Sequence, residues 1–291
     1  MALTSIIRGK GDIAILQNGG RPGAVSDRVC LPVSYEASRW PQGHLYSGVP
    51  AISRLGCAIT WLGHSAFHLQ TEPEGVGLLI DPWITNPRAP ANAEALARAA
   101  SLILLTHGHD DHVGGASAIA LESGATIASS LEVTTEMAAE GVPQAQLVGF
   151  NKGGAATIQG ITVTLTQALH SSSLPATDGR LRSVGDPCGL IIELPNGTVI
   201  YDTGDTCVFG DMALIAELYR PTVLMLPIGD FFTMGPRQAA KACELVAPEW
   251  IIPHHYGTGP ALTGTPDALR NLLPGRLADR VLAPPPGETI R

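Results

Sequence analysis

The chain has 291 residues, of which 45% are hydrophobic and 15% are charged, and its formal net charge at pH 7 is −8. This composition is sufficient for a large buried core, and an acidic chain lacks the basic surface expected of a nucleic-acid-binding protein. The sequence shows neither an apolar run of about 18 residues nor a signal-peptide pattern, so it predicts neither a membrane span nor export.

Residues 1–56 differ from the rest of the chain. They contain turn-forming pairs such as Gly19-Gly20 and Pro22-Gly23 and little sustained periodicity, apart from a short strand expected at Ile13–Gln17. We interpret them as an irregular N-terminal extension. It could wrap the main domain, mediate assembly, or form a partly ordered tail.

From Cys57 to Arg291 strands and helices alternate, which predicts one α/β domain over residues 57–291. Strands are expected at 57–63, 66–71, 76–81, 102–106, 126–129, 161–168, 189–194, 198–202, 222–228 and 250–253. Helices are expected at 92–100, 115–123, 131–140, 211–219, 236–246 and 266–273. A run of strands followed by interleaved helices occurs twice along the chain. This repetition favours a four-layer αββα sandwich with helices outside two sheets.

The cysteines do not form a recognisable framework. They stand at positions 30, 57, 188, 207 and 243, without a Cys-x-x-Cys pair. Free thiols in a reducing cytoplasm are therefore expected, rather than disulfides or a cysteine-rich zinc site.

The strongest chemical signal is His107-Gly108-His109-Asp110-Asp111-His112, which follows an apolar strand and precedes Gly114-Gly115. Loops at the carboxyl ends of strands are where open α/β sheets place their sites. Three imidazoles and two carboxylates this close together suit zinc and tolerate manganese or iron. In an extended backbone His107 and His109 point the same way, so one short segment could serve two adjacent metals.

The pattern His-x-His-x-Asp-His resembles the signature of the metallo-β-lactamase superfamily. Further residues follow later strands in the order that the resemblance implies: His170, Asp205 and His255. The resemblance covers about residues 57–291 and implies a metallo-β-lactamase sandwich with a two-metal site. It implies that one metal is held by His107, His109 and His170, that the other is held by Asp111, His112 and His255, and that Asp205 bridges both.

His254 and His255 compete for one ligand position, because either imidazole could bind a metal. The family pattern Pro-x-His-Tyr selects His255, and His254 remains the alternative.

A narrower resemblance is to metal-dependent hydrolases similar to L-ascorbate-6-phosphate lactonase. It rests on the segments Ile59–Phe67, Ile80–Trp83, Asn151–Gly154, Gly204–Thr206, Leu226–Asp230, Phe232–Pro236 and Pro286–Ile290. The chain departs from that pattern in its extension and in the segment Ser173–Gly185, which we interpret as a substrate-shaping loop. Both departures weaken any transfer of a substrate by analogy.

Three further residues have open roles. Asp81 is expected either to hydrogen-bond the metal-binding loop or to cap a turn. His64 is either a catalytic residue that donates to a substrate oxygen or a structural histidine, and Lys152 is more typical of a turn than of a catalyst.

These features predict a hydrolase with two divalent metal ions, zinc first and manganese or iron as alternatives, that share a bridging hydroxide. Asp111 would orient this hydroxide or carry its proton. The expected substrate is a small anionic ester, lactone or phosphoester, with no nucleic-acid or membrane partner, and the extension is compatible with a homo-oligomer. The competing hypotheses are a phosphodiesterase or nuclease acting on nucleic acid, and a non-hydrolytic di-iron redox or sensor protein.

Overall fold

The computed structural model describes residues 55–71, 75–176 and 178–291, all of which belong to one structural unit, Val49–Arg291. The expected strand Ile13–Gln17 and nearly all of the expected extension lie outside the described residues. No helix in these described ranges is long and apolar enough to cross a bilayer.

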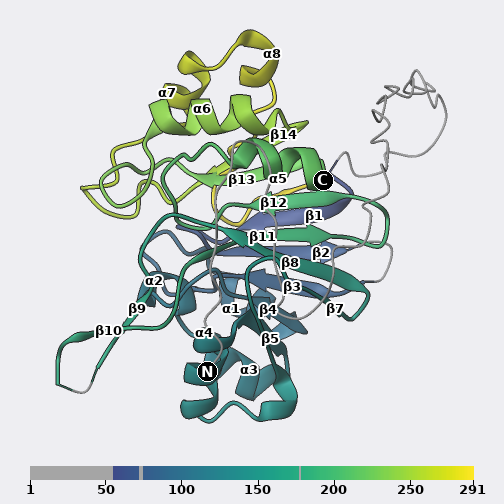
Figure 1. The fold of residues 1–291 in the computed structure, drawn as a ribbon, viewed down its shortest axis with the longest axis vertical. Coiled ribbons are helices and arrows are strands. Elements are labelled where there is room, and N and C mark those ends of the chain that lie inside the picture. The colour runs from purple at the N-terminus through teal and green to yellow at the C-terminus, as the bar shows by residue number, and fades with distance from the viewer. Residues whose placement is uncertain (1–54, 72–74, 177) are drawn as a thin grey trace, which may run out of the picture. The chain divides into compact units, whose positions relative to one another are not determined.

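Two sheets form the centre of this unit (Figure 1). The first has the order β15 (Thr289–Ile290), β1 (Cys57–Trp61), β2 (Phe67–Thr71), β3 (Gly77–Ile80), β4 (Leu102–Leu104), β5 (Thr126–Ser130) and β6 (Leu147–Phe150). The second has the order β14 (Trp250–His254), β13 (Val223–Pro227), β12 (Val199–Asp202), β11 (Cys188–Glu193), β8 (Ile161–Gln167) and β7 (Ala155–Ile158). A separate hairpin pairs β9 (Ser173–Pro175) with β10 (Leu181–Ser183).

Both sheets mix antiparallel and parallel pairing. Strands β1, β2 and β3 are antiparallel neighbours, whereas β3 to β6 run parallel. In the second sheet β12, β13 and β14 run parallel, so the loops that follow them lie at one edge of that sheet. This edge is where an α/β fold collects residues that act together.

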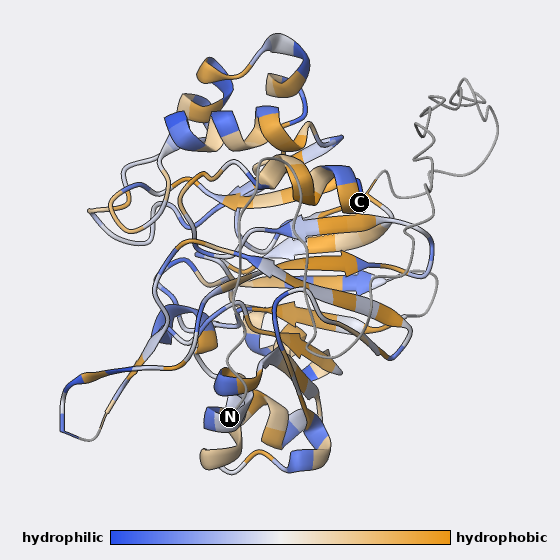
Figure 2. Ribbon diagram, viewed as in Figure 1, coloured by the Kyte–Doolittle hydropathy of each residue, from blue (hydrophilic) through white to orange (hydrophobic). Residues whose placement is uncertain are grey.

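Helices cover the outer faces of the sheets. They are α1 (Ala93–Ala99), α2 (Asp110–Val113), α3 (Ala116–Ser123), α4 (Leu131–Ala139), α5 (Met212–Tyr219), α6 (Pro236–Val246), α7 (Pro266–Leu272) and α8 (Gly275–Ala278), with a 3₁₀ turn at Gln144–Gln146. Helices α1, α3 and α4 pack on the first sheet through a cluster that includes Leu79, Ile103 and Met137. Helices α5, α6 and α7 share a second cluster with the strands of both sheets, and Figure 2 shows these strands as predominantly hydrophobic.

Local sequence signals explain several element ends. Helices α6 and α7 begin with Pro236 and Pro266, which a first helical turn tolerates because its N–H groups lack intrahelical partners. The Asn196-Gly197 pair forms the turn between the antiparallel strands β11 and β12, as the sequence predicts, and Gly197 has a φ of 88°. The predicted αββα class and every predicted strand and helix of residues 57–291 are confirmed by this arrangement.

The sequence did not predict β6, β7, β15, α2, α8 or the β9–β10 hairpin. The segment Ser173–Gly185 was expected to be a loop, and much of it forms this hairpin instead. These elements are two to four residues long, which is too short for a periodic pattern, and β15 depends on pairing with the distant strand β1.

Candidate metal centre

The loop after β4 brings the first group of candidate ligands together. His107 is buried, and His109 precedes α2 with an extended backbone, at φ −69° and ψ 145°. The Nε2 atom of His107 and the Nδ1 atom of His109 are 2.9 Å apart. With His170, which follows β8, they form a group in which one nitrogen atom of each ring lies within 4.8 Å of the others.

A second group lies beside the first. It consists of His64, Asp111, His112 and His255, whose ligand atoms also lie within 4.8 Å of one another. His112 and His255 are almost completely buried, whereas the side chain of Asp111 is 38% exposed.

Asp205 connects the two groups. Its Oδ2 atom lies 3.6 Å from Nε2 of His170 in the first group. The same oxygen lies 3.3 Å from Nε2 of His112 and 3.1 Å from Nε2 of His255 in the second group. The structure thus brings all seven residues of the expected ligand set into one site.

The structure separates the neighbouring residues His254 and His255. His254 ends β14, where its Nδ1 atom lies 3.2 Å from the hydroxyl of Ser65 and its Nε2 atom 3.7 Å from Asp202. His255 has a φ of 54°, which turns its side chain away from the line of the strand toward Asp205. Only His255 therefore faces the two groups.

Asp81 fixes the tautomers of two of these histidines. It accepts hydrogen bonds from Nδ1 of His112 at 2.7 Å, from the Thr106 hydroxyl at 2.6 Å and from the Thr106 N–H at 2.8 Å. Because the Thr106 hydroxyl donates to Asp81, it can accept from Nδ1 of His107, 2.9 Å away. Both imidazoles then carry their proton on Nδ1 and direct an Nε2 lone pair into the site. The expected hydrogen bonding of Asp81 to the metal-binding loop is confirmed.

Ser171 can hold His109 in the opposite tautomer, because its hydroxyl can accept a hydrogen bond from Nε2 of that ring. Its hydroxyl oxygen lies 3.3 Å from Nε2 of His109. A proton on that nitrogen leaves the lone pair of Nδ1 facing Nε2 of His107. Two lone pairs 2.9 Å apart repel each other unless a cation or proton lies between them.

His64 lies behind Asp111. Its Nε2 atom is 2.9 Å from Asp111 Oδ2, and its Nδ1 atom is 2.6 Å from the hydroxyl of Thr258. Burial lowers the pKa of His64 to about 4, so the ring is neutral near pH 7, and it can donate to Asp111 while it accepts from Thr258. Burial alone would raise the pKa of Asp111, but this hydrogen bond and nearby His112 hold it well below its usual range.

The distribution of charge in the site favours the binding of a cation. Burial tends to lower the pKa of His112, but the carboxylates of Asp205 and Asp81 raise it well above its usual value, so Nε2 of this ring holds a proton unless a metal ion takes its place. Among the described residues no lysine or arginine forms an ion pair with Asp111 or Asp205. Oδ1 of Asp205 and Nε2 of His112 are also buried without a hydrogen-bond partner. Buried carboxylates and lone pairs arranged in this way fit divalent metal ions.

A cavity of about 450 Å³ opens beside these residues. It is lined by His109, Asp110, Asp111, His170, Ser171, Ser173, Pro175, Leu181, Asp205, Phe232 and His255. Among the residues that the structure describes, this lining includes no lysine or arginine. Lys152 instead pairs with Asp186, Arg180 with Asp178, and Arg182 with Glu136.

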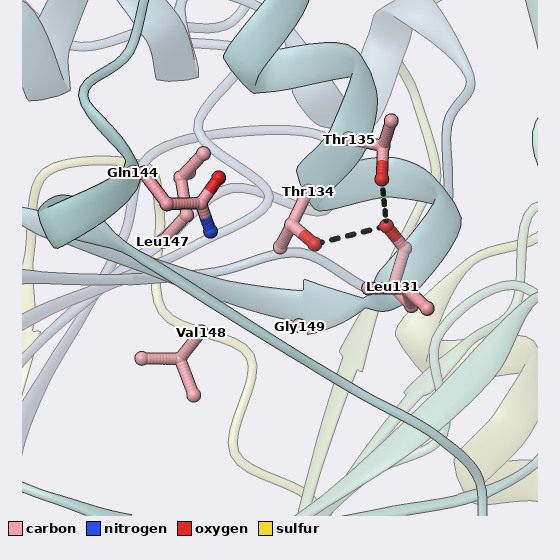
Figure 3. A pocket seen from close by; sticks show the side chains of 7 residues that line it. All are labelled: Leu131, Thr134, Thr135, Gln144, Leu147, Val148 and Gly149. Carbon is pink, nitrogen blue, oxygen red and sulfur yellow. Dashed lines mark hydrogen bonds between the residues drawn. The ribbon is translucent and has the colours of Figure 1, made fainter.

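A second cavity, of about 390 Å³, lies between α4, the 3₁₀ turn and β6 (Figure 3). Its lining contains Thr134 and Thr135, whose hydroxyls donate to the carbonyl of Leu131 within the helix. The described residues of this lining include no titratable or metal-ligating side chain, so they do not carry the chemistry of the first cavity.

The beta-lactamase superfamily domain matches residues 77–256, a range that contains the loop after β4 and the later candidate ligands. The chain belongs to the metallo-β-lactamase superfamily. Like its relatives it is a metal-dependent hydrolase. A "UPF0173 metal-dependent hydrolase" of Herpetosiphon aurantiacus is 49% identical over 232 residues, which cover 79% of this chain and 95% of that protein.

Solved structures support the superfamily fold. Igni18, a metallo hydrolase of Ignicoccus hospitalis, is 36% identical, with a TM-score of 0.70 over 80% of this chain and 97% of its own. CmlA, a diiron β-hydroxylase of Streptomyces venezuelae, is 14% identical, with a TM-score of 0.59 over 81% of this chain and 54% of its own. This second likeness concerns the fold alone.

Proposed function

We propose that the chain uses two divalent metal ions to hydrolyse an ester, lactone or phosphoester bond of a small molecule. The observation that carries the proposal is the position of Asp205 Oδ2, within 3.6 Å of histidines from both groups. One ion would be held by His107, His109 and His170, the other by Asp111, His112 and His255, and Asp205 would contact both. Zinc is our first expectation, and manganese and iron suit the same nitrogen and oxygen ligands.

Such ions supply a hydroxide nucleophile at neutral pH and polarise the substrate oxygen. Asp111, which is ionised and borders the cavity, would orient the attacking water or carry its proton, besides holding a metal ion. His64 holds Asp111 in this orientation and does not line the cavity, so we assign it a positioning role rather than donation to substrate.

A small-molecule substrate is favoured over nucleic acid. The chain has a net charge of −8, and the described cavity lining contributes aspartates but no lysine or arginine that could contact phosphates. An anionic substrate group would therefore depend on the metal ions for its binding. The motif resemblance to L-ascorbate-6-phosphate lactonase favours lactones as the first compounds to test, and a cytoplasmic location and a homo-oligomer remain predictions.

The test combines elemental analysis of the purified protein with a panel of lactones, phosphomonoesters and phosphodiesters. We expect about two equivalents of zinc, manganese or iron and hydrolysis that a chelator abolishes. In Asp205→Ala and His109→Ala we expect activity to fall at least about 100-fold, because metal ions contribute several kcal/mol to such reactions. Asp186→Asn, which changes an exposed carboxylate, is the matched control.

Full activity and full metal content in Asp205→Ala or His109→Ala would overturn the proposal. Two equivalents of iron together with redox-dependent visible absorption and no hydrolysis would instead indicate a di-iron redox protein.

A further inference from the structure

Exposed apolar side chains gather at the mouth of the metal cavity. Leu181 is 74% exposed and Phe232 is 61% exposed, yet both line the same cavity as His170 and Asp205. Apolar side chains that cluster on a surface beside a polar site commonly mark where a ligand binds.

The loop that carries Phe232 is held in a strained conformation. Asp230 and Phe231 have φ angles of 68° and 60°, which non-glycine residues seldom adopt. The loop is nevertheless anchored, because the Met234 N–H donates to the carbonyl of Thr206, next to Asp205, and Met234 is buried. Phe231 also packs edge-on against Phe232. An anchored, strained loop that presents aromatic rings to solvent indicates a functional constraint.

The β9–β10 hairpin supplies the rest of the apolar lining. It projects from the body of the domain in Figure 1. Leu181 and Pro175 are directly paired across its two strands, so their side chains lie on one face, and both line the cavity. At the base of the hairpin, Ser172 accepts a hydrogen bond from the Gly108 N–H in the metal-binding loop. The apolar face is thus fixed relative to the candidate ligands.

The cations that could bind a charged substrate group are engaged elsewhere. Arg182 follows Leu181 but makes a two-pronged ion pair with Glu136 of α4. Lys152 hydrogen-bonds Gln167 and Asp186. The described part of the cavity mouth therefore combines apolar surface with carboxylates, which favours a neutral, apolar substrate group.

We propose that Pro175, Leu181 and Phe232 form a subsite for an alkyl or aryl group attached to the reacting centre of the substrate. This inference rests on the proposed function and narrows its substrate class from small esters or lactones in general to those with an apolar substituent.

The test measures binding separately from turnover. Straight-chain alkyl hydroxamates, from acetohydroxamate to octanohydroxamate, would be titrated calorimetrically into the metal-loaded protein, because a hydroxamate binds a metal whether or not the enzyme hydrolyses a given ester. We expect Kd to fall by up to about fourfold per methylene over the first added carbons, as each buried methylene gains hydrophobic free energy. The kcat/KM of p-nitrophenyl esters from acetate to octanoate should rise in parallel.

Phe232→Ala and Leu181→Ser should flatten this dependence on chain length. Both side chains are exposed, so neither change should impair folding, which a thermal melt would verify. Leu218→Ser is the matched control, because Leu218 is 65% exposed but lies on α5 and does not line the cavity.

A Kd that is independent of chain length in the unmodified protein would overturn the subsite, as would a dependence unchanged in both variants. Ester hydrolysis without a chain-length dependence would leave the proposed function standing and reject the subsite. If the Kd of the hydroxamates falls with chain length as expected but no ester, lactone or phosphoester is hydrolysed, the subsite is supported and the proposed function is rejected.

Discussion

At the scale of single residues, hydrogen bonds to atoms outside the ligand set decide how the histidines are presented. Asp81 accepts from His112 directly and from His107 through the Thr106 hydroxyl, so one buried carboxylate controls two imidazoles. Partners of this kind typically raise metal affinity by orienting a ring before the metal binds. The backbone matters equally, since a positive φ at His255 turns it into the site.

His255→Ala and His254→Ala provide a matched pair of substitutions, because both imidazoles are buried and adjacent in the chain. For His255→Ala we expect the loss of about one metal equivalent and at least a 100-fold fall in activity, since several kcal/mol of metal assistance are lost. For His254→Ala we expect normal metal content and a loss of about 1–3 kcal/mol of stability, because polar partners such as Ser65 lose a contact. Elemental analysis, activity assays and denaturant unfolding would check both expectations.

If His254→Ala lost the metal and His255→Ala kept it, the assignment would be reversed.

At the scale of elements, the site is built from loops that follow strands, and one hairpin extends its edge. The β9–β10 hairpin contacts the metal-binding loop at its base and α4 through the Arg182–Glu136 pair. This pair lies at the surface, with Arg182 49% and Glu136 19% exposed, so its contribution is modest, but it connects the hairpin to a helix of the first sheet.

Glu136→Gln should loosen this hairpin in a pH-dependent way. The hydrogen bond from Arg182 lowers the pKa of Glu136, so the contribution of the pair is present above the ordinary pKa of a glutamate and is lost as pH falls through the lowered value. At neutral pH we expect amide hydrogen exchange of residues 173–183 to be roughly twofold to fivefold faster in the variant, corrected for intrinsic rates. The difference from the unmodified protein should vanish in acid.

Arg180→Leu is the control, because the Arg180 side chain is 86% exposed and its ion pair, with Asp178, lies inside the hairpin turn. Equal exchange rates for Glu136→Gln and the unmodified protein at neutral pH would contradict this role.

At the scale of the whole described unit, the candidate site joins the two sheets. The loop after β4 of the first sheet provides four of the proposed ligands, and loops after β8, β12 and β14 of the second sheet provide His170, Asp205 and His255. Metal ions bound by both sets would connect the two sheets at one edge. Their binding free energy would then stabilise the fold, because unfolding separates the ligands.

Metal removal should therefore lower the thermal stability of the protein. At a free metal concentration about 100 times Kd, each of the two ions contributes about 2.7 kcal/mol, and together they correspond to a fall in Tm of about 10–20 °C for a domain of this size. Differential scanning calorimetry before and after chelation, with metal added back, would measure the shift. A Tm that is unaffected by chelation, despite demonstrated loss of the metal, would contradict this prediction.

The sequence by itself determined the fold class and the composition of the candidate site. Strand and helix periodicity is local, and so is the spacing that places His107, His109, Asp111 and His112 in one loop, so both can be predicted without coordinates. Asp205 and His255 were found because they lie just after predicted strands in the order that the family resemblance implies.

Only the tertiary structure decided the features that depend on segments far apart in the chain. It decided that His255 rather than His254 faces Asp205, that His64 lies behind Asp111, and that β15 pairs with β1. It also brought Leu181 and Phe232 to one cavity, which no sequence spacing indicates. The physical reason is that a dihedral angle at a single residue, or a pairing between distant strands, sets the direction of a side chain without leaving a periodic signal in the sequence.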